Sequence, residues 1–173
     1  MPVTAPPTIS VVMPVYNTLR YLDVAVDSIL QQTLEDFEFL IFDDGSTAGS
    51  RERLQQYASR DSRIRLFLRS HGGLTPLLNE GLQKAKGQFI ARMDSDDIAE
   101  VHRFETQLNF LMNHLDYVAV GSEILRIDPG GLPIGIQGKY ETHNDIVHAF
   151  LSGKGGAIIH PSVMFVRSAL EEI

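Results

Sequence analysis

The sequence contains no cysteine. Disulfides and thiolate metal sites are therefore excluded, and any bound metal must be held by carboxylate, imidazole or carbonyl ligands. Basic residues are also in the minority, because 15 Lys and Arg residues face 22 Asp and Glu residues and leave a net charge of −7. No segment gathers the positive charge that nucleic-acid binding normally requires, so we expect no nucleic-acid partner.

Long apolar runs are missing as well. No stretch approaches the ~20 apolar residues that a membrane-spanning helix requires. Residues 1–7 lack the basic start and apolar centre of an export signal, so we expect neither export nor membrane insertion and place the protein in the cytoplasm. The 173 residues are nevertheless 43% hydrophobic, which is enough for one globular domain with a buried core.

Short apolar runs alternate with segments of helical period along most of the chain. The predicted strands are residues 9–15, 37–42, 64–68, 89–93, 117–120 and 162–166, and the predicted helices are residues 19–32, 51–59, 75–85, 103–114 and 144–151. This alternation predicts an α/β fold with a mainly parallel sheet and helices on both faces. Between residues 128 and 138, glycine and proline predict turns.

Three of the predicted strands end in polar residues. The first is followed by Tyr16 and Asn17, the second runs into Asp43-Asp44-Gly45-Ser46, and the fourth runs into Asp94-Ser95-Asp96-Asp97. Ligands of open parallel sheets bind beyond the carboxyl ends of the strands. The sequence therefore predicts a binding site along one rim of the sheet.

The run from Asp94 to Asp97 places three carboxylates within four residues. Their mutual repulsion is costly unless a cation or a hydrogen-bond network offsets it. Mg²⁺ and Mn²⁺ prefer oxygen ligands and take one or two protein carboxylates, with phosphate oxygens and water completing the shell. The same residues would also suit an Asx turn that caps a helix.

Other residues near the predicted strand ends have two interpretations each. Asp44 could accept hydrogen bonds from a base ring or belong to a capped turn, and Tyr16 could stack on a nucleobase or pack against the protein. Arg69 could face a phosphate or lie on the surface, and His160 could approach a metal or a sugar or be structural. The loop Gly153-Lys154-Gly155-Gly156 lacks the ending of a phosphate-binding loop, and we expect a mobile loop there.

Taken together, these segments closely resemble glycosyltransferase family two. The matching stretches are ISVVMPVYN at residues 9–17, FEFLIFDDGS at 37–46, NEG at 79–81, AKG at 85–87, IARMDSDD at 90–97 and HPSVMF at 160–165. The resemblance implies the GT-A fold, which is Rossmann-like. It divides the chain into a disordered tail at residues 1–8 and a single GT-A domain at residues 9–173, truncated at its C-terminus.

The resemblance also implies a reaction. A sugar passes from a nucleotide-diphosphate sugar, expected to be UDP-linked, to a glycan or lipid-linked acceptor with inversion, in the synthesis of a cell-surface polysaccharide. An acidic protein that binds a diphosphate needs a compensating cation, and the implied cofactor is Mn²⁺ or Mg²⁺. A lipid-linked acceptor would bring the protein into peripheral contact with the inner face of the membrane. The sequence indicates no oligomeric state.

Site residues follow from the matched motifs. The implied contacts of the nucleotide sugar are Pro14 and Tyr16 beside the base, Asp44 on its ring, and Asp94 and Ser95 near the ribose and diphosphate. Arg69 lies outside the matched motifs and is a candidate phosphate contact because it ends the third predicted strand. Asp96 is the implied metal ligand, with Asp94 as a second candidate. Inversion requires a general base. Neither Asp145 nor the pair Glu171-Glu172 has the expected context, so we expect the base beyond Ile173.

Three alternatives remain at this level. A nucleotidyltransferase would use a similar sheet and Mg²⁺, but it typically carries a basic glycine-rich loop where this chain has Pro14-Val15-Tyr16-Asn17. A phospho-receiver domain would place its acidic pair after the first strand, whereas the first predicted strand of this chain ends in Pro14-Val15-Tyr16-Asn17. A domain that binds a sugar nucleotide without transferring the sugar would share every motif named above.

Overall fold

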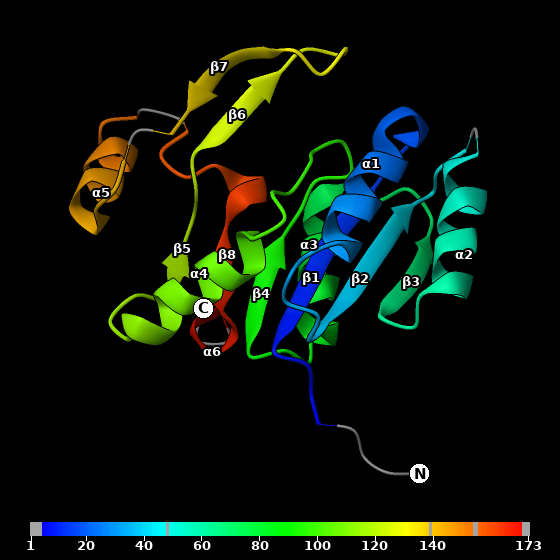
Figure 1. Cartoon of the computed structure of the whole chain (residues 1–173), viewed down its shortest axis with the longest axis horizontal. Coiled ribbons are helices and arrows are strands. Elements are labelled where there is room, and N and C mark those ends of the chain that lie inside the picture. Colours follow the sequence, from blue (N-terminus) through cyan, green and yellow to red (C-terminus); the bar gives the residue numbers. More distant parts are fainter. Residues whose placement is uncertain (1–4, 48, 139, 154–155, 171–173) are drawn as a thin grey trace.

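The computed structural model describes residues 5–47, 49–138, 140–153 and 156–170. Most of the predicted tail, at residues 1–4, lies outside these ranges, as do Lys154, Gly155, Glu171 and Glu172. Thr8, at the end of that tail, donates to Asp36 through its backbone N–H at 3.2 Å and through its hydroxyl at 2.5 Å. The described residues form one six-stranded sheet with helices beside it and a separate two-stranded hairpin (Figure 1).

The elements follow the predicted alternation. The strands are β1 (Ile9–Val15), β2 (Phe37–Asp44), β3 (Ile64–Arg69), β4 (Phe89–Arg92), β5 (Ala119–Val120), β6 (Ile124–Ile127), β7 (Pro133–Gln137) and β8 (Met164–Val166). The helices are α1 (Leu19–Leu30), α2 (Ser50–Arg60), α3 (Leu74–Lys84), α4 (Arg103–Asn113), α5 (His143–Leu151), the 3₁₀ turn η1 (His160–Ser162) and α6 (Arg167–Leu170). None of the helices in the described ranges is long and apolar enough to cross a bilayer.

The sheet has the strand order β3-β2-β1-β4-β8-β5. The first four strands of this order run parallel, whereas β8 is antiparallel to both β4 and β5. Val12 of β1 pairs with Leu40 of β2 and with Arg92 of β4, so the carboxyl ends of these three strands reach the same rim. The mainly parallel sheet confirms the predicted fold class.

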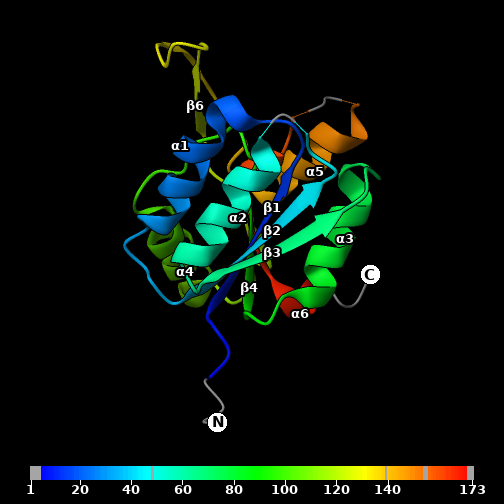
Figure 2. The same cartoon turned by 90° about the vertical axis from the view of Figure 1, so that its right-hand side faces the viewer.

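Helices cover both faces of the sheet, as Figure 2 shows with α1, α2 and α4 on one side and α3 and α6 on the other. On the first side, Leu22, Val26, Leu54 and Phe104 pack on inward-facing residues of the strands. On the second side, Leu77 packs with residues that include Val12, Leu40 and Phe42. Because the central strands are buried on both faces, most of their residues are apolar and the apolar residues do not alternate with polar ones.

The hairpin of β6 and β7 differs from the turns that glycine and proline predict. A tight turn does form, because the Asp128 carboxylate accepts from the N–H groups of Gly130 at 2.8 Å and Leu132 at 2.9 Å. The flanking residues pair as antiparallel strands, although Pro133 and Gly135 lower the strand propensity of β7. The sequence signal was weak because most of the hairpin is exposed and lacks the pattern that burial imposes.

Candidate functional site

The loops that follow β1, β2 and β4 are joined by side-chain hydrogen bonds. The Thr18 hydroxyl donates to the Ser95 hydroxyl at 2.9 Å, which links the first loop to the acidic run. Asn17 accepts from the N–H of Thr47 at 2.8 Å and donates its own N–H to Ser46 at 3.0 Å. Asn17 has a φ of 54°, a left-handed conformation that Asn tolerates better than most residues. The three polar segments predicted to share one rim are therefore in contact.

The two neighbouring carboxylates at the end of β2 differ in their surroundings. Asp43 is fully buried and pairs with Arg51 at 2.8 Å, and it also accepts from the N–H of Ser46. Asp44 accepts from the N–H groups of Gly72 at 2.8 Å and Gly73 at 3.0 Å. Asp43 thus closes the turn after β2, whereas Asp44 holds the loop that follows β3.

Gly45 allows this loop to come close. Its φ is +75°, and a Cβ at this position would lie 2.7 Å from the backbone nitrogen of His71. Only glycine combines that conformation with that approach. Gly45 is therefore required by the structure, and Asp44 of the same segment holds the loop after β3.

Tyr16 lies at the rim with 48% of its surface exposed. The ring of His71 stacks on it with 4.2 Å between the ring centroids and 22° between the ring planes. The Nδ1 atom of His71 also lies 2.9 Å from the Asp44 carboxylate. His71 was not predicted as a site residue. Its position before Gly72 and Gly73, between β3 and α3, is the feature of the sequence that could have indicated it.

The acidic run contains side chains of different exposure. Asp94 is half-buried and pairs with Arg92, whose Nη2 lies 2.5 Å from Oδ1 of Asp94. Ser95 is buried, and Asp96 and Asp97 are exposed. Partial desolvation of its carboxyl, together with the negative charges of Asp94 and Asp96, raises the pKa of Asp97. The run is therefore short of positive charge on its exposed side.

The described residues contain no cluster of three or more His, Asp or Glu side chains that could hold a metal by themselves. A divalent ion at Asp94 and Asp96 would thus need phosphate oxygens and water to complete its shell. Magnesium and manganese sites at phosphates typically have this composition. The residues present fit a metal that arrives with a diphosphate.

The structure gives Arg69 a partner within the protein. Its guanidinium pairs with Glu80 of α3, with 2.8 Å between Nε and Oε2, and it holds the pKa of that carboxyl below its usual range. The predicted phosphate contact of Arg69 stays a prediction. Pro14 is half-buried near the end of β1, where it pairs with Phe42 of β2.

His160 lies in the turn η1 near the acidic run. The pKa of His160 is lowered, because burial and the positive charge of Arg92 outweigh the negative charge of Asp94. His160 therefore interacts electrostatically with both residues. The glycine loop after α5 includes Lys154 and Gly155, which lie outside the described residues, so its predicted mobility stays a prediction.

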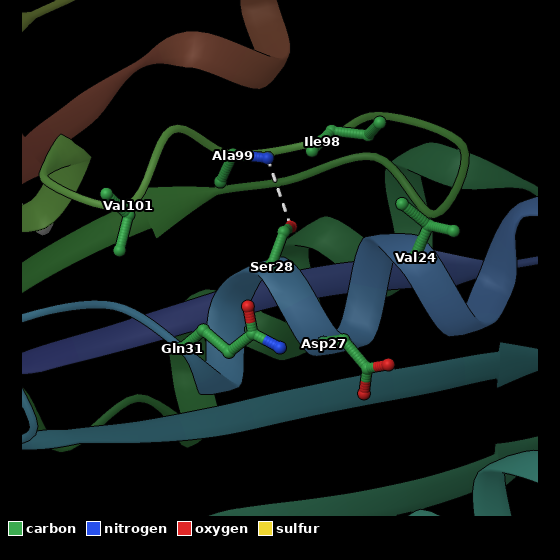
Figure 3. Close-up of a pocket in the computed structure, with 7 residues that line it drawn as sticks. All are labelled: Val24, Asp27, Ser28, Gln31, Ile98, Ala99 and Val101. Atoms are coloured by element: carbon green, nitrogen blue, oxygen red, sulfur yellow. Dashed lines mark hydrogen bonds between the residues drawn. The ribbon is translucent and has the colours of Figure 1, made fainter. Parts of the chain in front are cut away.

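A shallow depression of about 290 Å³ lies beside α1 rather than among the strand ends (Figure 3). It is bounded by α1 and by the segment that follows the acidic run, and the N–H of Ala99 donates to the Ser28 hydroxyl at 3.0 Å across its floor. Its lining residues are Val24, Asp27, Ser28, Gln31, Ile98, Ala99 and Val101. None of them is a predicted site residue.

Comparison with known proteins agrees with this geometry. Residues 10–173 match the family model described as Glycosyl transferase family 2. The chain belongs to this family. The O-antigen biosynthesis glycosyltransferase WbnJ of Escherichia coli is 35% identical over 163 residues, which cover 94% of this chain and 63% of that protein. The putative glycosyltransferase EpsE of Bacillus subtilis is 34% identical over 165 residues, which cover 94% of this chain and 58% of that protein.

Solved structures confirm the GT-A fold at low sequence identity. The mannosyltransferase PcManGT from Pyrobaculum calidifontis, in complex with GDP-Man and Mn²⁺, superposes with a TM-score of 0.70 at 18% identity, over 98% of this chain and 47% of that one. Residues 1–349 of S. aureus TarS, in complex with UDP-GlcNAc, superpose with a TM-score of 0.67 at 18% identity, over 95% and 47%. The chain thus spans about half of these structures.

Proposed function

We propose that this chain is the donor-binding part of a metal-dependent, inverting glycosyltransferase. The observation that carries the proposal is the joining of three strand-end loops at one rim, through the contacts of Thr18 with Ser95 and of Asn17 with Thr47. This arrangement brings an aromatic ring, a recessed carboxylate and an acidic run together. The ring and the recessed carboxylate suit a nucleobase, and the acidic run suits a ribose and a metal-bound diphosphate.

The donor is proposed to be a UDP-linked sugar. Its base would lie beside Pro14 and Tyr16 with a ring N–H directed to Asp44, and its ribose and diphosphate would lie near Asp94 and Ser95. Structures of similar fold support a nucleotide donor, since one contains UDP-GlcNAc and another contains GDP-Man with Mn²⁺. Pocket shape selects between sugars, so the sugar itself is left unnamed.

The metal is proposed to be Mn²⁺ or Mg²⁺, held by Asp96, with Asp94 as a second candidate ligand. Bound there, it would act as a Lewis acid that stabilises the leaving diphosphate. The exposed position of Asp96 leaves it free to meet a metal that arrives with the donor. The raised pKa of Asp97 supports a cation at this run, because a positive charge would offset the repulsion between the carboxylates.

The acceptor is proposed to be a glycan or glycolipid of the cell surface, modified at the cytoplasmic face of the membrane. The names of two relatives, one in O-antigen biosynthesis and one in teichuronic acid biosynthesis, support this class. Inversion needs a general base that takes the proton of the acceptor hydroxyl. We propose none of the described residues for that role.

Isothermal titration calorimetry tests the donor site. UDP, GDP and dTDP are titrated with and without Mn²⁺ into the wild type, into Asp96→Ala and into the control Asp116→Ala, whose exposed side chain lies outside the site. We expect UDP to bind most tightly, with a dependence on Mn²⁺ that Asp96→Ala removes and Asp116→Ala preserves. If no nucleoside diphosphate binds, or if binding ignores both the metal and Asp96, the proposal is wrong.

A further inference from the structure

Arg92 is a buried cation directly beside the acidic run. It is the last residue of β4, and only 5% of its surface is exposed. Its Nη2 lies 2.5 Å from the Asp94 carboxylate, whereas Nε and Nη1 have no hydrogen-bond partner within the described ranges. A guanidinium keeps its charge even when buried, so it needs an anionic partner. Asp94 is the carboxylate that the structure places in contact with it.

A second arginine, Arg103, which is half-buried, fixes the backbone at this point. The Nη2 of Arg103 donates to the carbonyl oxygen of Arg92 at 2.8 Å and to that of Val163 at 3.4 Å, and its Nε donates to Gln107 at 3.1 Å. Arg103 therefore donates to carbonyl and amide oxygens and, through Nη1, to the sulfur of Met93 at 3.6 Å. It holds the end of β4 in place and leaves the side chain of Arg92 to meet Asp94.

The ion pair with Arg92 gives Asp94 different electrostatic surroundings from Asp96. A carboxylate has about four acceptor positions, so Asp94 can pair with Arg92 and still accept from another donor. Its negative charge is already matched by the guanidinium, which reduces what it can offer to a metal. Asp96 is exposed and has its charge available. The two carboxylates are thus suited to different tasks, a hydroxyl group for Asp94 and a metal for Asp96.

We infer that Arg92 is a positioning residue that orients Asp94 toward the ribose hydroxyls of the donor and leaves the metal to Asp96. This inference rests on the proposed function, since it assigns the parts of a nucleotide to two carboxylates of that site. Arg92 itself contacts neither the nucleotide nor the metal. Its effect should therefore appear as a loss of ribose recognition and not as a loss of metal dependence.

Deoxynucleotides measure ribose recognition directly. UDP, 2′-deoxyuridine diphosphate and 3′-deoxyuridine diphosphate are titrated into the wild type, Arg92→Met and Arg92→Lys, each with Mn²⁺. We expect the wild type to prefer UDP over at least one deoxy analogue by about tenfold, the effect of a hydrogen bond to a charged group. Arg92→Met should bring that ratio close to one, and Arg92→Lys, which keeps the charge, should restore part of it. In each variant the ratio of UDP affinities with and without Mn²⁺ should stay as in the wild type.

Arg65→Met is the matched control. Arg65 pairs with the nearly buried Glu38 and donates to the carbonyl oxygen of Lys84. Both Arg65 and Glu38 lie near the amino ends of their strands, whereas the acidic run follows the carboxyl end of β4. The variant removes a similar ion pair and should leave the deoxynucleotide ratios unchanged. If Arg92→Met does not fold, as judged by circular dichroism, Arg92→Lys and Asp94→Asn decide, and both should lower the ratio.

The outcomes separate the inference from the proposed function. If UDP does not bind the wild type, the proposed function fails. If UDP binds the wild type but the folded Arg92 variants keep the wild-type ratios, the inference is overturned. It is also overturned if Mn²⁺ dependence disappears together with the ratio, since Arg92 would then act on the metal ligand.

Discussion

The imidazole of His71 stacks on the phenol ring of Tyr16 at 4.2 Å and lies 2.9 Å from the Asp44 carboxylate. Tyr16 and Asp44 are the two side chains that the proposed function assigns to the nucleobase. In the free protein a different aromatic ring therefore contacts both of them. A base that uses the same stacking face and the same carboxylate has to displace His71.

Removal of this ring should therefore favour the nucleotide. We expect His71→Ala to bind UDP about three- to tenfold more tightly than the wild type, because an aromatic stack is worth about 0.5–1.5 kcal/mol and no longer has to be broken. Calorimetry measures the change. The control is His114→Ala, which removes a similar contact with Phe110 that involves no predicted site residue. Weaker binding by His71→Ala would mean that His71 contacts the bound nucleotide instead.

The contact between Thr18 and Ser95 offers a second test. Thr18→Val keeps the shape of the side chain and removes the hydroxyl that donates to Ser95, a buried residue. We expect a loss of about 1 kcal/mol in the free energy of unfolding, measured by urea denaturation, together with weaker UDP binding. Thr75→Val, on α3, serves as the control. Unchanged UDP binding by a destabilised Thr18→Val would show that the two loops do not need this link.

Gly87 tests how closely the segment after α3 packs on β1. A Cβ at this position would lie 2.5 Å from the backbone nitrogen of Ser10 and 2.7 Å from the carbonyl carbon of Ile9. Backbone atoms cannot yield as a side chain can, so Gly87→Ala should lower the free energy of unfolding by about 2 kcal/mol or more. Gly72→Ala, whose Cβ would lie 3.8 Å from the carbonyl oxygen of Ser70, should be nearly neutral. Equal stabilities of the two variants would refute this packing.

The phenol of Tyr57 gives a prediction for alkaline pH. Burial and the hydrogen bond to Asp27 raise its pKa from 10 to about 12. Because the folded state holds this proton more tightly than the unfolded state, the stabilisation is complete below pH 10 and is lost as the pH rises toward about 12. The stability advantage of the wild type over Tyr57→Phe should therefore shrink across that range. Urea denaturation at several pH values measures it, and an advantage that stays constant would contradict the raised pKa.

The sequence predicts the elements that are buried on both sides. Residues 9–15 were predicted as a strand and form β1 with the same bounds, because a continuous apolar run of this length has few other solutions. The β6–β7 hairpin was missed because its exposed strands carry no such constraint. Sequence alone therefore specifies the layers of the core better than the surface elements.

The meeting of the strand-end segments at one rim was predictable from the sequence, but the pairings of their side chains were not. The sequence places Asp43 and Asp44 at a strand end, and successive residues of a strand point to opposite faces, so they cannot share one role. Which of them faces the loop after β3 depends on tertiary contacts. The same holds for the pairs of Arg92 with Asp94 and of Arg69 with Glu80, whose geometry is set by packing and not by spacing along the chain.

The hydrogen bonds that join the strand-end loops also constrain how this protein can change. Asn17 contacts the loop after β2, Thr18 contacts the loop after β4, and Asp44 holds the loop after β3. A substitution in one loop removes a partner from another, so its effect depends on what the other loop carries. We expect strong epistasis among these positions, and an altered donor preference should evolve through coordinated changes in several loops.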